Sequence, residues 1–499
     1  MTFRVRLLAA AGGALWLLFA SLALRDPVAL FDMPIVEDGW YALSVARSIG
    51  RGLGITIDGT TWTNGFQPLF TFLEAGAFAL AGGSEEGGLR LVLLLAAIVH
   101  GTGALLVAGI ARDAVGGAAG PRSLAGALAL VGYLAAPKAF NDFYNGLETV
   151  LQMALYAAAW RFYATGWRTH FGGRAAMGAL LGALVLARID AAVFVAAFCA
   201  AELWRGRTDL RAAIGICFVV GGIAVLVSAP WWLYNALVFG HPMPTSGFAQ
   251  QAFAFSAERA EQAVWALVSV AVPWVFAGAH EAWWTEALRL AVLAGVGFMA
   301  MQARRSGGLS ALDRERAGFA AILLATCAAL ATYYWLEFFA YWFYVRYFAP
   351  LSLLAFVYVP VLAARVAPRL ATGVVLATAV LAAVLLAFAW RGEGIFGHAA
   401  NDIQVALAEK YVPEADMVAA GQSGTLGFKR ARVVNVDGKV NPEALKWRGR
   451  MWEYLDARGI GWFVDSTWYV ETYLGTDPAA HGWHKVAQED DWAVYRRQR

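Results

Sequence analysis

Two adjacent carboxylates, Glu37 and Asp38, stand at the start of a segment with helical periodicity. Polar residues between Ser44 and Arg51 share one face and apolar residues share another, which predicts an amphipathic helix lying in a membrane interface. Acids at a helix start can simply cap it and complement its dipole. The alternative is chemistry: a carboxylate can accept the proton of an attacking hydroxyl, and the pair could hold a divalent cation such as Mg²⁺ or Mn²⁺.

A third acid, Glu148, begins an apolar span near membrane depth. An ionisable side chain is costly there and is a functional candidate by default, although capping the helix or pairing with Lys138 would also explain it. Arg188 and Asp190 lie in the middle of a long apolar stretch. They can pair with each other, or the guanidinium can hold a phosphate through its two-pronged donor geometry.

The composition places these residues in a membrane protein. Of the 499 residues, 60% are hydrophobic and 15% are charged, whereas soluble proteins carry about 25% charged residues. A formal net charge of +3 is too small to indicate a nucleic-acid-binding protein. Cys199, Cys217 and Cys327 all fall in apolar runs without metal-ligand spacing, so neither a disulfide framework nor a zinc site is predicted.

Apolar stretches of spanning length recur from about residue 7 to about residue 390. The runs 67–81 and 263–278 are doubtful, because one is short and opens on Pro68 and the other contains Pro273. The positive-inside rule favours eleven spans without these two runs, since that count places the arginine-rich loops on one side. The expected spans lie near residues 7–24, 88–111, 123–137, 149–164, 175–189, 190–204, 212–237, 284–303, 317–336, 346–364 and 370–390.

An odd number of spans separates the two ends of the chain. With a cytoplasmic amino terminus, the tail lies in the periplasm, on the same side as the acid-bearing segments 25–87, 138–148, 188–190 and 238–283. We therefore predict an α-helical membrane domain over residues 1–390, with outer loops at 25–87 and 138–148. A periplasmic α/β domain is predicted over residues 391–499.

Within this tail, strands are expected at 416–420, 433–436 and 462–465, with a helix over 443–458. The glycine-rich string GQSGTLG at 421–427 suggests a nucleotide site. It lacks the full dinucleotide fingerprint and faces a compartment without nucleotide pools. We therefore do not expect a nucleotide site there.

Several passages resemble the bacterial membrane glycosyltransferases of the GT-C class, the group related to the aminoarabinose and protein-mannosyl transferases. The chain reads EDGWYALSVARSIGRGLG from Glu37 and TNGFQPL from Thr63, where the family has a "DDAFYYLxIARNIAxGxG" helix and a "TNGFxPL" turn. The main departure is Glu37 in place of the first aspartate. Further similar elements are NGLET at 145–149, the P-x-S loop at 241–247, RYFAP at 346–350 and VVNVDGKVN at 433–441. The last of these passages implies that the tail is an accessory domain that covers the site.

The resemblance implies a GT-C fold in a bacterial inner membrane and a hexosyl or pentosyl transfer. A sugar would pass from a polyprenyl-phosphate donor to a hydroxyl of a glycan, a lipid-linked saccharide or a protein at the periplasmic face, with inversion. Asp38 is favoured as base because Gly39 leaves room beside it and its side chain is short. The other candidates are Glu37 and Glu148 for catalysis; Arg188, Lys138, Arg346 and Tyr347 for the donor phosphate; Asn64, Gln67, Asn145, His241 and Ser246 for substrate; and Glu37 with Asp38 for a metal.

A secondary transporter or flippase for a lipid-linked or anionic substrate is the competing class, because many spans and intramembrane charges suit it too. Transporter halves commonly show repeats, and no repeat is evident along this chain. The large polar tail also counts against this alternative.

Overall fold

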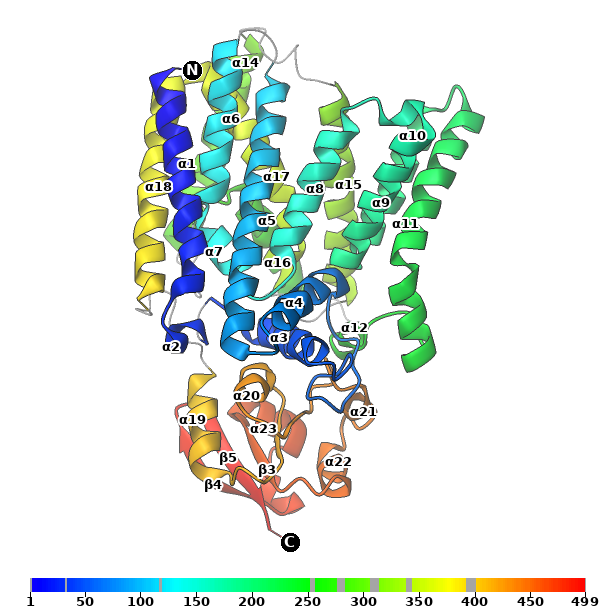
Figure 1. Ribbon diagram of the computed structural model, residues 1–499, viewed down its shortest axis with the longest axis vertical. Coiled ribbons are helices and arrows are strands. Elements are labelled where there is room, and N and C mark those ends of the chain that lie inside the picture. Colours follow the sequence, from blue (N-terminus) through cyan, green and yellow to red (C-terminus); the bar gives the residue numbers. More distant parts are fainter. Residues whose placement is uncertain are drawn as a thin grey trace.

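The computed structural model describes residues 2–31, 34–115, 119–251, 256–275, 283–305, 314–337, 343–391 and 401–498. Long helices run side by side and a small mixed sheet caps one end of the bundle (Figure 1). The amino terminus lies at the far end of the bundle and the carboxyl terminus lies beyond the sheet (Figure 1). The molecule thus has a helical part and a tail, and the predicted boundary at residue 391 falls directly after the helix that ends at Trp390.

Seven helical segments of the described residues have the length and hydropathy needed to cross a membrane. They are Phe3–Leu24 (α1 with a short 3₁₀ turn), Glu85–Ala114 (α5), Leu210–Phe239 (α11), Trp283–Arg305 (α14), Glu315–Glu337 (in α15), Ala349–Val366 (with α17) and Pro368–Trp390 (α18). Four shorter helices lie alongside them: α6 (Ala119–Leu134), α8 (Thr149–Tyr163), α9 (Phe171–Ala187) and α10 (Ala191–Arg205). Each of the eleven expected spans overlaps one of these helices, but four of the helices fall short in length, so the count of eleven stays a prediction.

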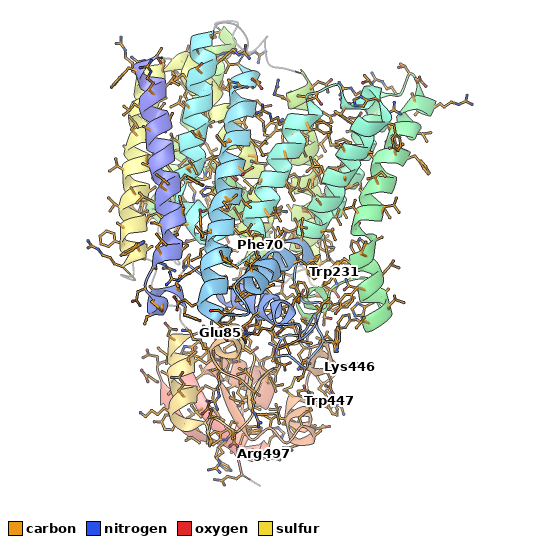
Figure 2. The ribbon with its side chains drawn as sticks, in the orientation of Figure 1. Phe70, Glu85, Trp231, Lys446, Trp447 and Arg497 are labelled. Atoms are coloured by element: carbon orange, nitrogen blue, oxygen red, sulfur yellow. The ribbon has the colours of Figure 1, made fainter. Side chains whose placement is uncertain are left out.

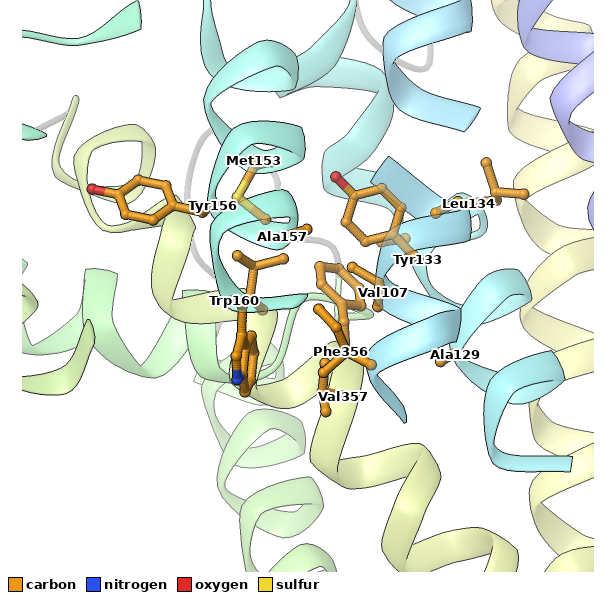
Figure 3. Packing of buried hydrophobic residues seen from close by; sticks show 14 of the residues in the cluster. Val107, Ala129, Tyr133, Leu134, Met153, Tyr156, Ala157, Trp160, Phe356 and Val357 are labelled. Carbon is orange, nitrogen blue, oxygen red and sulfur yellow. The ribbon is translucent and has the colours of Figure 1, made fainter. Parts of the chain in front are cut away.

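The core of the bundle is built from large apolar and aromatic side chains that interlock (Figure 3). Val107 of α5, Tyr133 of α6, Trp160 of α8 and Phe356 of α17 are all buried, and the rings of Tyr133 and Phe356 lie 4.9 Å apart. The outer helices instead expose large apolar side chains, such as Leu237 of α11, which is 83% exposed. An apolar exterior around a packed core is the arrangement that a bilayer requires.

Short helices lie at the end of the bundle that faces the sheet (Figure 1). They include α3 (Glu37–Gly50), the predicted amphipathic helix, and α4 (Pro68–Leu80), which begins with proline at its first position. At 13 residues, α4 is about 20 Å long and cannot cross a hydrocarbon core of about 30 Å. Further short helices are α2 (Pro27–Leu30), α7 (Pro137–Phe143), α12 (Thr245–Ala249), α13 (Ala257–Ala271) and α16 (Tyr344–Tyr347).

The tail is a five-stranded sheet of order β2-β1-β3-β5-β4. Strand β1 (Val418–Ala420) pairs in parallel with β2 (Val433–Asn435) and with the central strand β3 (Trp462–Ser466), which confirms the three predicted strands. An antiparallel hairpin of β4 (Trp483–Glu489) and β5 (Trp492–Arg497), absent from the prediction, extends the sheet beyond β3. The helices are α19 (Asp402–Tyr411), α20 (Gly424–Lys429), α21 (Pro442–Leu445), α22 (Met451–Ala457) and α23 (Thr467–Leu474).

The helix predicted over 443–458 is therefore wrong as a single element. It is divided into α21 and α22, and Gly449 lies between them with a φ of +83°. A left-handed residue cannot continue a right-handed helix, so the chain turns there.

Candidate functional site

A cavity of about 450 Å³ lies where the short helices, the ends of the long helices and the tail meet. Figure 2 places Phe70 of α4, one of the lining residues, at this end of the bundle, with Lys446 and Trp447 of the tail beyond it. Among the described residues, six ionisable side chains other than tyrosine line the cavity, three acids and three bases. They are Asp38, Glu148, Asp190, Arg188, Arg346 and Lys439.

Asp38 and Glu148 reach the same cavity because α3 packs backbone to backbone against the loop before α8. A Cβ placed on Gly39 would lie 2.0 Å from the carbonyl oxygen of Asn145, so only glycine fits there. The same carbonyl accepts a hydrogen bond of 3.2 Å from the amide of Val36. Asn145 is thus a structural link between α3 and the loop that carries Glu148, and its side chain does not line the cavity.

Glu148 forms a buried ion pair with Arg188, with 2.6 Å between Oε1 and Nη1. The guanidinium also binds Asp190 at 2.7 Å and lies over the ring of Tyr347, and the hydroxyl of Tyr334 donates to Asp190 at 2.6 Å. Glu148 makes no side-chain capping bond to α8, so capping does not explain it. The alternative in which Arg188 pairs with Asp190 is the one observed, and two carboxylates now share its positive charge.

Asp38 faces the two remaining cations of the cavity. Its carboxylate lies 3.9 Å from Arg346 and 3.5 Å from the ammonium of Lys439, longer than the 2.7–2.9 Å of a tight charged hydrogen bond. The Nε atom of Arg346 is buried and has no hydrogen-bond partner among the described residues. These cations are therefore held loosely, in contrast to Arg188.

Glu37 points away from the cavity and binds the tail. Its carboxylate accepts hydrogen bonds from the amides of Gly424 and Thr425, from the Thr425 hydroxyl (2.7 Å) and from the side chain of Asn401. Burial raises its pKa, against the lowering effect of these hydrogen bonds. Neighbouring side chains on a helix diverge by about 100°, which explains how Glu37 and Asp38 take different surroundings.

These contacts do not fit the expected cation at the Glu37–Asp38 pair. The Glu37 oxygens are occupied by N–H and O–H donors, and Asp38 faces two positive charges. Within the described ranges, no group of three or more His, Cys, Asp or Glu residues is placed to hold a metal.

The tail docks on α3 through several further contacts. Tyr41 donates to the carbonyl of Gly421 at 2.8 Å and accepts from the amide of Ser423 at 3.0 Å. Arg47 donates to the carbonyl of Phe428 at 2.8 Å and lies over its ring. The tail is thus held against α3, and its Lys439 lines the cavity.

The candidate substrate residues are only partly gathered at the cavity. Gln67 and Ser246 line it, and Gln67 accepts a hydrogen bond from the amide of Ile189 at 3.2 Å. Asn64 is fully buried and accepts from the amide and hydroxyl of Thr245, so it joins two loops instead. His241 contacts the carbonyl of Met243 and does not line the cavity. The side chain of Lys138 lies outside the described residues.

Sequence reasoning missed Lys439 and the hydrogen bond from Tyr334 to Asp190. Lys439 belongs to the passage VVNVDGKVN, which was noted for its family resemblance alone. A signal was available in that passage: a lysine and an aspartate two residues apart in a glycine turn of a domain expected to cover the site.

No protein-family model matches the chain, and no curated protein matches its sequence. Solved structures do match. ArnT from Cupriavidus metallidurans bound to undecaprenyl phosphate has a TM-score of 0.60 at 14% identity, over 98% of this chain and 97% of that one. The archaeal oligosaccharyltransferase AglB from Archaeoglobus fulgidus, in complex with an inhibitory peptide and a dolichol-phosphate, has a TM-score of 0.55 at 13% identity, over 100% of this chain and 75% of that one.

The chain therefore has the GT-C fold of membrane glycosyltransferases, as the sequence resemblance predicted. Its likeness to ArnT extends over nearly the whole of both chains, whereas AglB is the longer protein.

Proposed function

We propose that this protein is a glycosyltransferase that moves a sugar from a polyprenyl-phosphate donor to a hydroxyl acceptor. The observation that carries the proposal is the position of Asp38, which faces two loosely held cations in a cavity at the end of a membrane bundle. The GT-C fold supports it, because a structure with that fold holds undecaprenyl phosphate.

The chemistry is a direct displacement at the anomeric carbon. Asp38 accepts the proton of the acceptor hydroxyl as the new C–O bond forms, while the bond from the anomeric carbon to the phosphate oxygen breaks. The electron pair leaves with the polyprenyl phosphate, and Arg346 stabilises the growing negative charge. The product has the inverted configuration, and no covalent sugar intermediate forms.

Glu148 has a separate part in this proposal. Its tight pair with Arg188 fixes a carboxylate at the cavity wall, where it accepts hydrogen bonds from sugar hydroxyls and orients the ring. Because Glu148 and Asp190 already neutralise Arg188, the phosphate role is assigned to Arg346 in preference to Arg188.

The proposed location is a bacterial inner membrane, with the cavity and tail on the periplasmic side and the acceptor a glycan, a lipid-linked saccharide or a protein. The arginine distribution supports this orientation. No observation in the described part of the chain favours the transporter or flippase alternative.

The test is single-turnover transfer by the purified full chain. Detergent-solubilised protein is incubated with polyprenyl-phosphate sugars carrying a radiolabel, together with candidate acceptors, and the release of polyprenyl phosphate is followed. Label transfer that depends on Asp38 supports the proposal. If the folded protein leaves every hexose-linked and pentose-linked donor unconsumed, the proposal is refuted.

A further inference from the structure

We infer that Lys439, a residue of the tail, binds the donor phosphate and completes the cavity of the membrane domain. This rests on the proposed function, because it assigns one ligand of the same site. Among the cavity-lining residues of the described chain, Lys439 is the one that comes from beyond the helical part.

The backbone at Lys439 is fixed against the membrane domain. A Cβ placed on Gly65 would lie 1.9 Å from the carbonyl oxygen of Lys439, so the tail touches the TNGF turn without a side chain between them. Gly438 turns the chain with a φ of +81°, and its amide donates to Asn435 at 3.1 Å. Asn435 in turn donates to the hydroxyl of Tyr41 on α3. The lysine therefore extends from an anchored turn.

The charges around Lys439 leave it able to take a new anion. Burial alone would lower the pKa of its ammonium, but the carboxylates of Asp38 and Asp437 outweigh that effect and the pKa is raised, so the group is positively charged. Both carboxylates lie at long range, 3.5 Å and 3.6 Å. An ammonium has three donors, and neither contact is a tight charged hydrogen bond.

The other cations of the cavity explain why a third positive charge favours binding of the donor phosphate. Arg188 is bound by Glu148 at 2.6 Å and by Asp190 at 2.7 Å. Among the described lining residues of the membrane part, this leaves Arg346 as the cation with a loosely held charge. A sugar phosphodiester carries one negative charge, and the departing polyprenyl monophosphate gains a second as the bond breaks. Lys439 and Arg346 together match that second charge, whereas Arg346 alone does not.

The competing explanation is that Lys439 only fastens the tail to Asp38. Binding of undecaprenyl phosphate to the full chain in detergent, measured by thermophoresis, separates the two. We expect Lys439→Gln to weaken binding about tenfold or more, as loss of one charged hydrogen bond does. Lys439→Arg should recover most of the affinity, and Lys446→Gln, at an exposed lysine of the same domain (Figure 2), should bind as the wild type does.

Three other results would each contradict the inference. If Arg346→Gln weakens binding and Lys439→Gln does not, the inference is wrong and the proposed function stands. If the wild-type chain fails to bind undecaprenyl phosphate, both are wrong. If Lys439→Gln speeds hydrogen exchange at the start of α20 as Glu37→Gln does, the loss of affinity is assigned to docking of the tail and the inference is overturned.

Discussion

The carboxylate of Glu148 and the guanidinium of Arg188 lie 2.6 Å apart, both almost fully buried, although 40 positions separate them in the chain. A buried ion pair contributes little net stability, but the loss of one partner leaves an uncompensated charge. Here Asp190 is a second counter-charge for the same arginine. Either acid can therefore be neutralised without leaving Arg188 alone.

From this arrangement we predict that Glu148→Gln lowers turnover strongly, by about 10²-fold or more, with a nearly normal yield of folded protein. Asp190→Asn should also fold. The double variant should lose about 3–5 kcal/mol of stability, because Arg188 then has no carboxylate within reach. Thermal unfolding in detergent and specific activity measure the two effects. A single Glu148→Gln variant that unfolds readily, while its folded fraction is fully active, would contradict the functional role.

Asp38→Asn should separate catalysis from donor binding. Removal of the general base should lower kcat by about 10² to 10⁴-fold. Affinity for undecaprenyl phosphate should stay the same or increase, because the competing negative charge beside Arg346 and Lys439 disappears. Glu86→Gln, which removes an exposed carboxylate paired with Arg90, is the matched control. Equal loss of kcat and phosphate affinity would indicate that Asp38 acts in binding.

Glu37→Gln should weaken the docking of the tail. The amide replaces one acceptor oxygen with a donor that faces the N–H groups of Gly424 and Thr425, which costs about 1–3 kcal/mol. Faster hydrogen exchange at the start of α20, with a modest fall in activity, is the expected result. Unchanged exchange in an inactive variant would instead return Glu37 to the catalytic role expected from the sequence.

The stability of the tail should depend on pH through Asp465. Burial raises the pKa of this carboxyl to about 8, although three backbone amides hydrogen-bond it. Because the pKa of the folded state lies above the ordinary value of 3.8, the folded state holds one more proton than the unfolded chain between these two pH values. The stabilisation of the folded state by the protonated Asp465 carboxyl is fully present below the pKa of the unfolded chain. It is lost as pH rises through about 8.

The free energy of unfolding should therefore fall as pH rises in this window, and Asp465→Asn should flatten that fall. Thermal unfolding of the full chain at a series of pH values tests this. Asp490→Asn is the control, because Asp490 is exposed and its φ of 49° suits asparagine. An identical slope in Asp465→Asn and wild type would show that other groups govern the dependence.

The proposed orientation in the membrane rests on the distribution of arginines and can be checked with reporter fusions. Fusions after residues 117, 170, 208 and 310 should report cytoplasm, and those after 60, 143, 250 and 450 should report periplasm. A periplasmic signal at 170 or 208 would overturn the eleven-span arrangement. The acids would then not share one compartment.

Local pattern was enough to predict the amphipathic helix from Glu37, the long apolar helices and three strands of the tail. It could not divide the roles of Glu37 and Asp38, because that division depends on Thr425 and Lys439, about 390 to 400 residues away. The pairing of Glu148 with Arg188 could not be predicted either, because the two residues lie on different elements, 40 positions apart. The periodicity of a sequence indicates which face of a helix or strand is apolar. It does not indicate which side chain of another element will pair with a given residue, because that depends on tertiary packing.

The β4–β5 hairpin was missed because exposed polar residues such as His484 and Lys485 interrupt the apolar signal of its first strand. An edge strand of this kind is exposed on both faces for much of its length, so alternation carries little information.

The contact between Asp38 and Lys439 joins residues 401 positions apart, and this separation has a consequence for biosynthesis. Ribosomes make the chain from its amino terminus, and folding of early segments begins during synthesis. In the proposed orientation, the start of α3 with Asp38 is exported long before the turn with Lys439 exists. Under the proposed function, a half-made chain in the bilayer has its base but lacks the lysine of the tail, and we expect it to be inactive until translation is nearly complete.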